Sequence, residues 1–150
     1  MANGPEPRLT GTLETVLVVD DNDTVREVVV AILERANYKV LSSASAAAAL
    51  QVAGATEKID LLLSDVEMPL MSGPDLGAML KTTRPTMRVM LMSGGATGNL
   101  LVLNYGWAYI QKPFVPEKLV QMVTEVLHSK DRSQEGGQGF DSRKDIKGRE

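Results

Sequence analysis

The segment Ile59-Asp60-Leu61-Leu62-Leu63-Ser64-Asp65 is mostly apolar and ends in a hydroxyl and a carboxylate, and it gives the clearest indication of the fold. Leucines at consecutive positions are typical of a central strand that is covered on both faces, as in parallel sheets. Other short apolar runs predict further strands, and segments of helical period separate them. This alternation favours an α/β fold with a doubly wound parallel sheet and helices on both faces.

The predicted elements occupy the middle of the chain. Strands are expected at Thr15–Val19, Tyr38–Ser42, Ile59–Ser64, Arg88–Met92 and Trp107–Gln111. Helices are expected after a cap at Asn22 or Asp23, and at Ala44–Ala53, Pro74–Thr83, Thr97–Tyr105 and Pro116–His128. Residues 1–13 and 130–150 lack apolar periodicity, so we expect a flexible arm and a flexible polar tail around one domain at residues 14–129.

Composition and charge argue against several classes of protein. The formal net charge of -3 does not suit a nucleic-acid groove, which needs clustered positive charge. The sequence has no cysteine, which removes disulfides, thiolate nucleophiles and most zinc sites. No apolar run approaches the ~20 residues that cross a bilayer, and the first residues lack the order of a signal peptide. We therefore expect a cytoplasmic protein without a membrane partner.

Polar side chains follow the predicted strands at the edge where ligands bind in open parallel sheets. Asp20 and Asp21 follow the first strand, Asp65 the third, Ser93 the fourth and Lys112 the fifth. Taken singly, each is typical of a helix cap, a turn or an exposed loop. Their joint occurrence at one edge of one sheet instead indicates a site.

The chemistry of these groups points to a divalent cation and a phosphoryl group. Three neighbouring carboxylates raise one another's pKa unless a cation neutralises them. Oxygen ligands of this kind suit Mg²⁺, and Mn²⁺ could substitute. A hydroxyl and an ammonium beside them can stabilise phosphoryl oxygens during transfer.

The motifs around these residues resemble the receiver domains of response regulators in two-component signal transduction. The resemblance covers about residues 14–129 and rests on Val16-Leu17-Val18-Val19-Asp20-Asp21, Leu62-Leu63-Ser64-Asp65-Val66-Glu67-Met68-Pro69-Leu70-Met71-Ser72-Gly73, Met92-Ser93-Gly94 and Lys112-Pro113-Phe114. It implies a flavodoxin-like sheet of five parallel strands in the order 2-1-3-4-5.

The resemblance also implies an acceptor and a metal site. Asp65 would be the phosphoacceptor, supplied by a histidine kinase or a histidine phosphotransfer protein. Asp21 would bind Mg²⁺ directly, Asp20 would assist through water or an indirect contact, and the backbone carbonyl of Glu67 would complete the protein ligands. The domain would catalyse only its own phosphorylation and dephosphorylation, so we do not expect an enzyme that acts on other substrates.

Further roles follow from the same resemblance. Lys112 would pair with Asp65 and then with the phosphoryl group, and its bond to Pro113 would be cis. Ser93 would move to contact a phosphoryl oxygen, and Tyr109 would be the aromatic switch behind it. The change of surface would then reach a partner, with a homodimer as one possibility.

Two features depart from the family pattern. Only 19 positions lead from Ser93 to Lys112, which predicts a shortened or irregular fourth helix and an altered output face. Gly94 and Gly95 leave the phosphoryl site less crowded than larger residues would, which predicts an effect on phosphoryl lifetime.

Other functions remain open at this point. Asp21-Asn22-Asp23-Thr24-Val25 fits the start of a haloacid-dehalogenase phosphatase, although that family needs a later acidic pair and only Glu117 and Glu125 follow, on a helix. A pseudo-receiver that binds without phosphorylation is a third hypothesis. The single histidine, His128, is expected at the surface rather than as a phosphodonor. The sequence does not separate a single-domain regulator from a receiver of a hybrid kinase.

Overall fold

A computed structural model describes residues 13–95 and 105–129. In this part of the chain a five-stranded sheet has the order β2-β1-β3-β4-β5, and each neighbouring pair is parallel. The strands are β1 (Thr15–Val19), β2 (Lys39–Ser43), β3 (Leu61–Asp65), β4 (Arg88–Ser93) and β5 (Ala108–Gln111). The predicted flavodoxin-like order is therefore confirmed.

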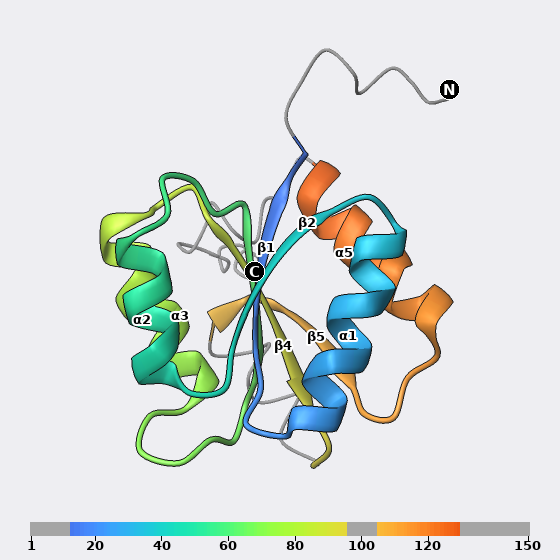
Figure 1. The fold of residues 1–150 in the computed structure, drawn as a ribbon, viewed down its shortest axis with the longest axis horizontal. Coiled ribbons are helices and arrows are strands. Elements are labelled where there is room, and N and C mark those ends of the chain that lie inside the picture. The colour runs from blue at the N-terminus through green and yellow to red at the C-terminus, as the bar shows by residue number, and fades with distance from the viewer. Residues whose placement is uncertain (1–12, 96–104, 130–150) are drawn as a thin grey trace, which may run out of the picture.

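Helices cover both faces of this sheet (Figure 1). They are α1 (Asp23–Arg35), α2 (Ala46–Gly54), α3 (Gly73–Thr83) and α5 (Pro116–His128). Helices α1 and α5 lie on one face, and α2 and α3 lie on the other. Because parallel strands need crossover connections, this alternation of helices carries the chain from one strand to the next.

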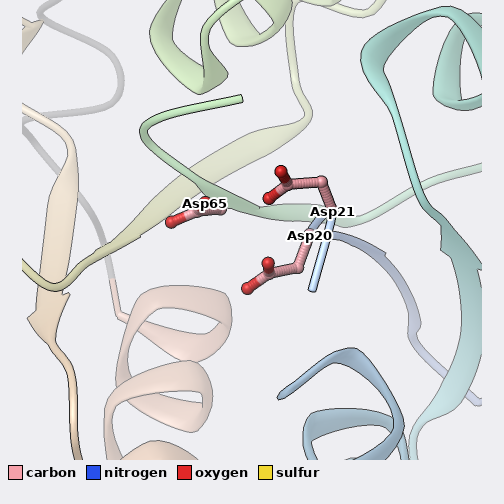
Figure 2. A group of neighbouring side chains, drawn as sticks. All are labelled: Asp20, Asp21 and Asp65. Atoms are coloured by element: carbon pink, nitrogen blue, oxygen red, sulfur yellow. The ribbon is translucent and has the colours of Figure 1, made fainter. Parts of the chain in front are cut away.

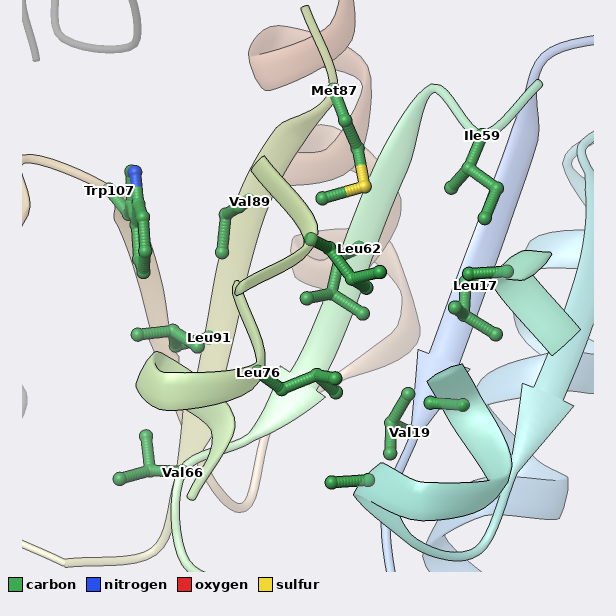
Figure 3. Close-up of a cluster of buried hydrophobic side chains, with 14 residues drawn as sticks. Leu17, Val19, Ile59, Leu62, Val66, Leu76, Met87, Val89, Leu91 and Trp107 are labelled. Atoms are coloured by element: carbon green, nitrogen blue, oxygen red, sulfur yellow. The ribbon is translucent and has the colours of Figure 1, made fainter. Parts of the chain in front are cut away.

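Alternate side chains of the strands fill two separate cores. Leu17 and Leu62 face α2 and α3, and they lie in one buried cluster with Leu76 of α3 and with Trp107 (Figure 3). Their neighbour Leu63 faces the opposite side, where it packs with buried residues of α1 and α5. Each fully buried leucine side chain contributes about 1.5–3 kcal/mol relative to an exposed one. The run of leucines is thus buried on both faces, as the sequence predicted.

Several predicted boundaries are wrong by one or two residues, and local hydrogen bonds explain why. Lys39 rather than Tyr38 begins β2, because the Tyr38 amide donates to Leu33 O at the end of α1 (3.1 Å). Helix α2 begins at Ala46 rather than Ala44, because the side chain of Ser45 accepts from the Ala48 amide as the N-cap.

The remaining shifts are of the same size. β3 begins at Leu61 rather than Ile59, since the Thr15 amide bonds the Asp60 carboxylate (2.8 Å) in place of a backbone carbonyl. β2, β3 and β4 each end one residue later than predicted, at Ser43, Asp65 and Ser93. Helix α2 also ends one residue later, at Gly54, and α3 starts one residue earlier, at Gly73. β5 begins at Ala108, after Trp107.

Other predictions agree with the structure in full or fall outside it. The bounds of β1 and α5 are as predicted, and Asn22 rather than Asp23 caps α1 by accepting from the Val25 amide. The helix expected at Thr97–Tyr105 lies, except for Tyr105, outside the described residues, as do residues 1–12 and 130–150. No helix within residues 13–95 and 105–129 is long and apolar enough to span a bilayer. The cytoplasmic location stays a prediction.

Candidate functional site

The carboxyl ends of β1 and β3 bring three aspartates together. Val19 is in register with Ser64, so Asp20 and Asp65, the next residue of each strand, lie side by side. One carboxylate oxygen from each of Asp20, Asp21 and Asp65 lies within 4.8 Å of the other two (Figure 2). This spacing and this all-oxygen donor set fit a hard divalent cation.

Asp20 is completely buried and is held by bonds from several elements. Its amide donates to Ser43 O at the end of β2 (3.2 Å), and its Oδ1 accepts from the Asn22 amide (2.9 Å). Its Oδ2 accepts from Lys112 Nζ (2.9 Å). Asp21, in contrast, is exposed, so its carboxylate is the one that a hydrated ion can reach first.

Lys112 joins the far edge of the sheet to this cluster. Its Nζ lies 2.9 Å from Asp20 Oδ2 and 3.1 Å from Asp65 Oδ1, and its side chain is 21% exposed. Its amide donates to Ser93 O (2.8 Å), and the Lys112-Pro113 peptide is cis, as expected. This one ammonium contacts two of the three carboxylates, so the cluster keeps an excess of negative charge for a cation to balance.

The pKa values of the central pair are both raised. The pKa of the Asp65 carboxyl lies above its ordinary value of 3.8, and burial is the largest cause. The negative charges of Asp20 and Asp21 raise this pKa further, whereas the hydrogen bond and the charge of Lys112 lower it. For Lys112, burial alone would lower the pKa, but its hydrogen bonds to Asp20 and Asp65 and their charges outweigh that and raise it above 10.5. Lys112 therefore stays protonated beside the acceptor at neutral pH.

The loop after Asp65 is built around a close backbone approach. A Cβ added to Gly73 would lie 2.2 Å from Asp65 O, an oxygen that also accepts from the Ser64 hydroxyl (2.9 Å). The Gly73 amide donates to Val66 O (2.9 Å), which closes the loop. Within it, Leu70 is fully exposed and has a positive φ of 74°. Glu67 is exposed at the start of this loop, and cation binding by its carbonyl stays a prediction.

Ser93 and Tyr109 meet at the end of β4. Ser93 is 2% exposed, and its hydroxyl oxygen accepts from the Gly95 amide (3.0 Å). The Tyr109 hydroxyl donates to Gly95 O over 3.5 Å. Both side chains therefore contact the same short segment rather than the carboxylates. A Cβ added at Gly94 would meet no atom of residues 13–95 and 105–129 within 4 Å.

The structure separates the two aspartates that fit the phosphatase motif. Asp21 lies in the cluster, but Asp23 begins α1, is 76% exposed and pairs with Arg26 (2.6 Å). A haloacid-dehalogenase arrangement would need both at one centre. His128 is exposed and pairs with Glu14 (2.8 Å) at the end of α5, far along the chain from the carboxylates.

Sequence reasoning missed one residue of this region. Arg26 donates from Nη1 to Asp20 O (2.7 Å), so a cation from the first turns of α1 reaches the strand end. The signal was available, because Arg26 follows the Asn22 cap by one helical turn on the side of the helix that faces the sheet end.

Comparisons with known proteins find similar sequences over most of this chain. Residues 16–124 match the family described as the response regulator receiver domain. The chain is 34% identical over 121 residues to the sensor kinase CckA of Brucella abortus, which covers 78% of this chain but 13% of that kinase.

Solved structures have the same fold. A response regulator receiver domain protein of Clostridium thermocellum superposes with a TM-score of 0.72 at 26% identity, over 79% of this chain and 97% of that one. The receiver domain of the hybrid histidine kinase CckA gives a TM-score of 0.66 at 33% identity, over 76% and 99%.

Proposed function

The chain belongs to the response regulator receiver domain family of two-component signalling, and on that premise we propose that Asp65 accepts a phosphoryl group in a Mg²⁺-dependent reaction. The observation that carries the proposal is the position of Lys112 Nζ, within 3.1 Å of the Asp65 carboxylate and 2.9 Å of Asp20, beside a three-carboxylate cluster.

The reaction forms one bond and breaks one. A carboxylate oxygen of Asp65 attacks the phosphorus, the bond between phosphorus and the donor's nitrogen or oxygen breaks, and the donor leaves with the electron pair. Lys112 keeps its proton throughout and moves its contacts from the carboxylate to the phosphoryl oxygens. Such catalysis is mainly positioning and electrostatic stabilisation.

Asp20, Asp21 and Asp65 would hold the cation, with the Glu67 carbonyl as a further ligand. When bound, Mg²⁺ would neutralise charge that develops on the transferred phosphoryl group. The buried Asp20 is already bonded to Lys112 and the Asn22 amide, which suits an indirect role, whereas the exposed Asp21 suits direct binding.

The contacts of Gly95 suggest how phosphorylation would change the surface, because Gly95 is bonded to both Ser93 and Tyr109. A phosphoryl group on Asp65 carries roughly −2 charge and attracts the Ser93 hydroxyl. A movement of Ser93 toward the phosphoryl group would lengthen its bond from the Gly95 amide and shift Gly95, whose carbonyl also accepts from Tyr109. Phosphorylation would therefore release Tyr109 and change the surface at β5.

The donor would be a histidine kinase or a histidine phosphotransfer protein, and the domain would act only on its own acceptor. The chain spans a small part of the sensor kinase to which it is similar, so a regulator of one domain and a receiver of a hybrid kinase both remain hypotheses, as does a homodimer. We keep residues 14–129 as the proposed folded unit.

Incubation with acetyl phosphate and Mg²⁺ tests the proposal. We expect a mass gain of one phosphoryl group that a chelator prevents and that Asp65→Asn abolishes. The matched control is Asp75→Asn, which makes the same change at an exposed position of α3 and should be labelled like the wild type. Labelling of Asp65→Asn would refute the assignment, and steady hydrolysis of unrelated phosphoesters would favour a phosphatase instead.

A further inference from the structure

Arg26 makes contacts that the chemistry described so far does not use. Its side chain is 16% exposed, Nη1 donates to Asp20 O (2.7 Å) and Nη2 donates to Asp23 Oδ1 (2.6 Å). The guanidinium thus reaches from α1 back to the end of β1 and is held there by an ion pair. A charged donor on a backbone carbonyl makes a stronger hydrogen bond than a neutral one.

The accepting carbonyl belongs to the peptide that joins Asp20 to Asp21. Because a peptide unit is planar, a bond to its oxygen fixes the direction in which the Asp21 Cα leaves the strand. Asp20 is held by three further bonds, at its amide and at both carboxylate oxygens. In the described residues, the Asp21 carboxylate itself accepts no hydrogen bond, so its backbone is what orients it.

We propose that Arg26 is a positioning residue of the cation site, which holds the Asp20-Asp21 peptide so that both carboxylates face Asp65. This inference rests on the proposed Mg²⁺-dependent function. Arg26 would act from outside the cluster of carboxylates. It would orient the site through its bond to the backbone and would not contact the ion.

The Mg²⁺ affinity of Arg26→Gln should change in opposite directions, depending on whether Arg26 acts through its charge or by positioning Asp21. If only its charge mattered, removing a cation near the cluster would strengthen Mg²⁺ binding, because two positive charges repel. If it positions Asp21, the variant should bind Mg²⁺ more weakly, by about 10-fold, as is common when groups that orient metal ligands are lost. The sign of the change decides between the two.

The experiment measures the dissociation constant of Mg²⁺ by calorimetry, together with urea unfolding of the metal-free protein. Arg35→Gln is the matched control: it removes the same charge from the same helix at an exposed residue about 13 Å further along the axis. We expect it to change the affinity by less than about twofold, since exposed charges at that distance are screened.

A second variant, Arg26→Lys, separates a positioning role from a general loss of structure. Arg26→Lys keeps the charge but not the two-pronged donor geometry, and it should also bind Mg²⁺ more weakly than the wild type. Raising Mg²⁺ to saturation should restore the phosphorylation rate of both variants, which a general loss of structure would not allow.

Failure of the role proposed for Arg26 and failure of the proposed Mg²⁺-dependent function give different results in these measurements. Tighter or unchanged Mg²⁺ binding by Arg26→Gln or Arg26→Lys, in a chain whose wild type binds Mg²⁺, would overturn the role of Arg26 alone. A wild-type chain that binds no Mg²⁺ would instead overturn the proposed function. An equal loss of Mg²⁺ affinity in Arg35→Gln would also overturn the role of Arg26, because the loss would then not depend on the contact with Asp20 O.

Discussion

The close approach of Gly73 to Asp65 makes a quantitative prediction for Gly73→Ala. The new Cβ would lie 2.2 Å from Asp65 O and 3.0 Å from Asp65 C. Restoring ordinary contact requires a backbone shift of about 1 Å, and misplacement of a reacting group by that amount costs about 100-fold in rate. The Gly73 amide is bonded to Val66 O, so the helix start cannot simply move away.

Both stability and phosphorylation should respond. Overpacking costs about 1–3 kcal/mol, and we expect the upper end because backbone atoms rather than a flexible side chain must move. Urea unfolding would measure this loss, and the rate of labelling by acetyl phosphate would fall by about 100-fold.

Gly54→Ala is the control for the substitution itself. It lies in α2, where an added Cβ meets nothing within 4 Å, so alanine should stabilise the protein by about 0.5 kcal/mol and leave labelling unchanged. A Gly73→Ala protein as stable and as readily labelled as Gly54→Ala would show that the close approach of Gly73 to Asp65 O does not constrain the site.

Three further predictions concern the charged cluster and its surroundings. Because the raised pKa of Asp65 favours its proton in the folded state, its contribution to stability is full below pH 3.8 and is lost as pH rises through the raised value. Metal-free Asp65→Asn should therefore gain stability over the wild type between acid and neutral pH in urea unfolding, and a constant difference would contradict this. Lys112→Met should lose about 3 kcal/mol at neutral pH without metal, because Asp20 and Asp65 would face each other unpaired. Added Mg²⁺ should recover part of that loss, and no recovery would argue against a cation at this site. Gly77→Ala would bring a Cβ to 3.1 Å from the ring of Trp107, the only tryptophan, so we expect a cost of about 1–2 kcal/mol and shifted fluorescence. Unchanged emission would count against that contact.

Much of the fold could be predicted because burial leaves a local pattern. The apolar run before Asp65 predicted a strand covered on both faces, and its leucines are indeed buried on both. Boundaries were less predictable where a side chain competes with the backbone, as Ser45 does at the start of α2 and Asp60 does beside Thr15. Such bonds depend on neighbours that the local sequence does not specify.

Local patterns in the sequence were enough to identify the groups at the strand ends, since each follows an apolar run. The types of these groups already implied a cation and a phosphoryl group. The difference between Asp20 and Asp21 arises from folding, because Asp20 is buried and bonded to Lys112, whereas Asp21 is exposed. Folding also places the guanidinium of Arg26 on the peptide between them. A residue type is a local property, whereas burial and hydrogen-bond partners depend on distant segments, as with Lys112 and Asp20, which are 92 positions apart in the chain.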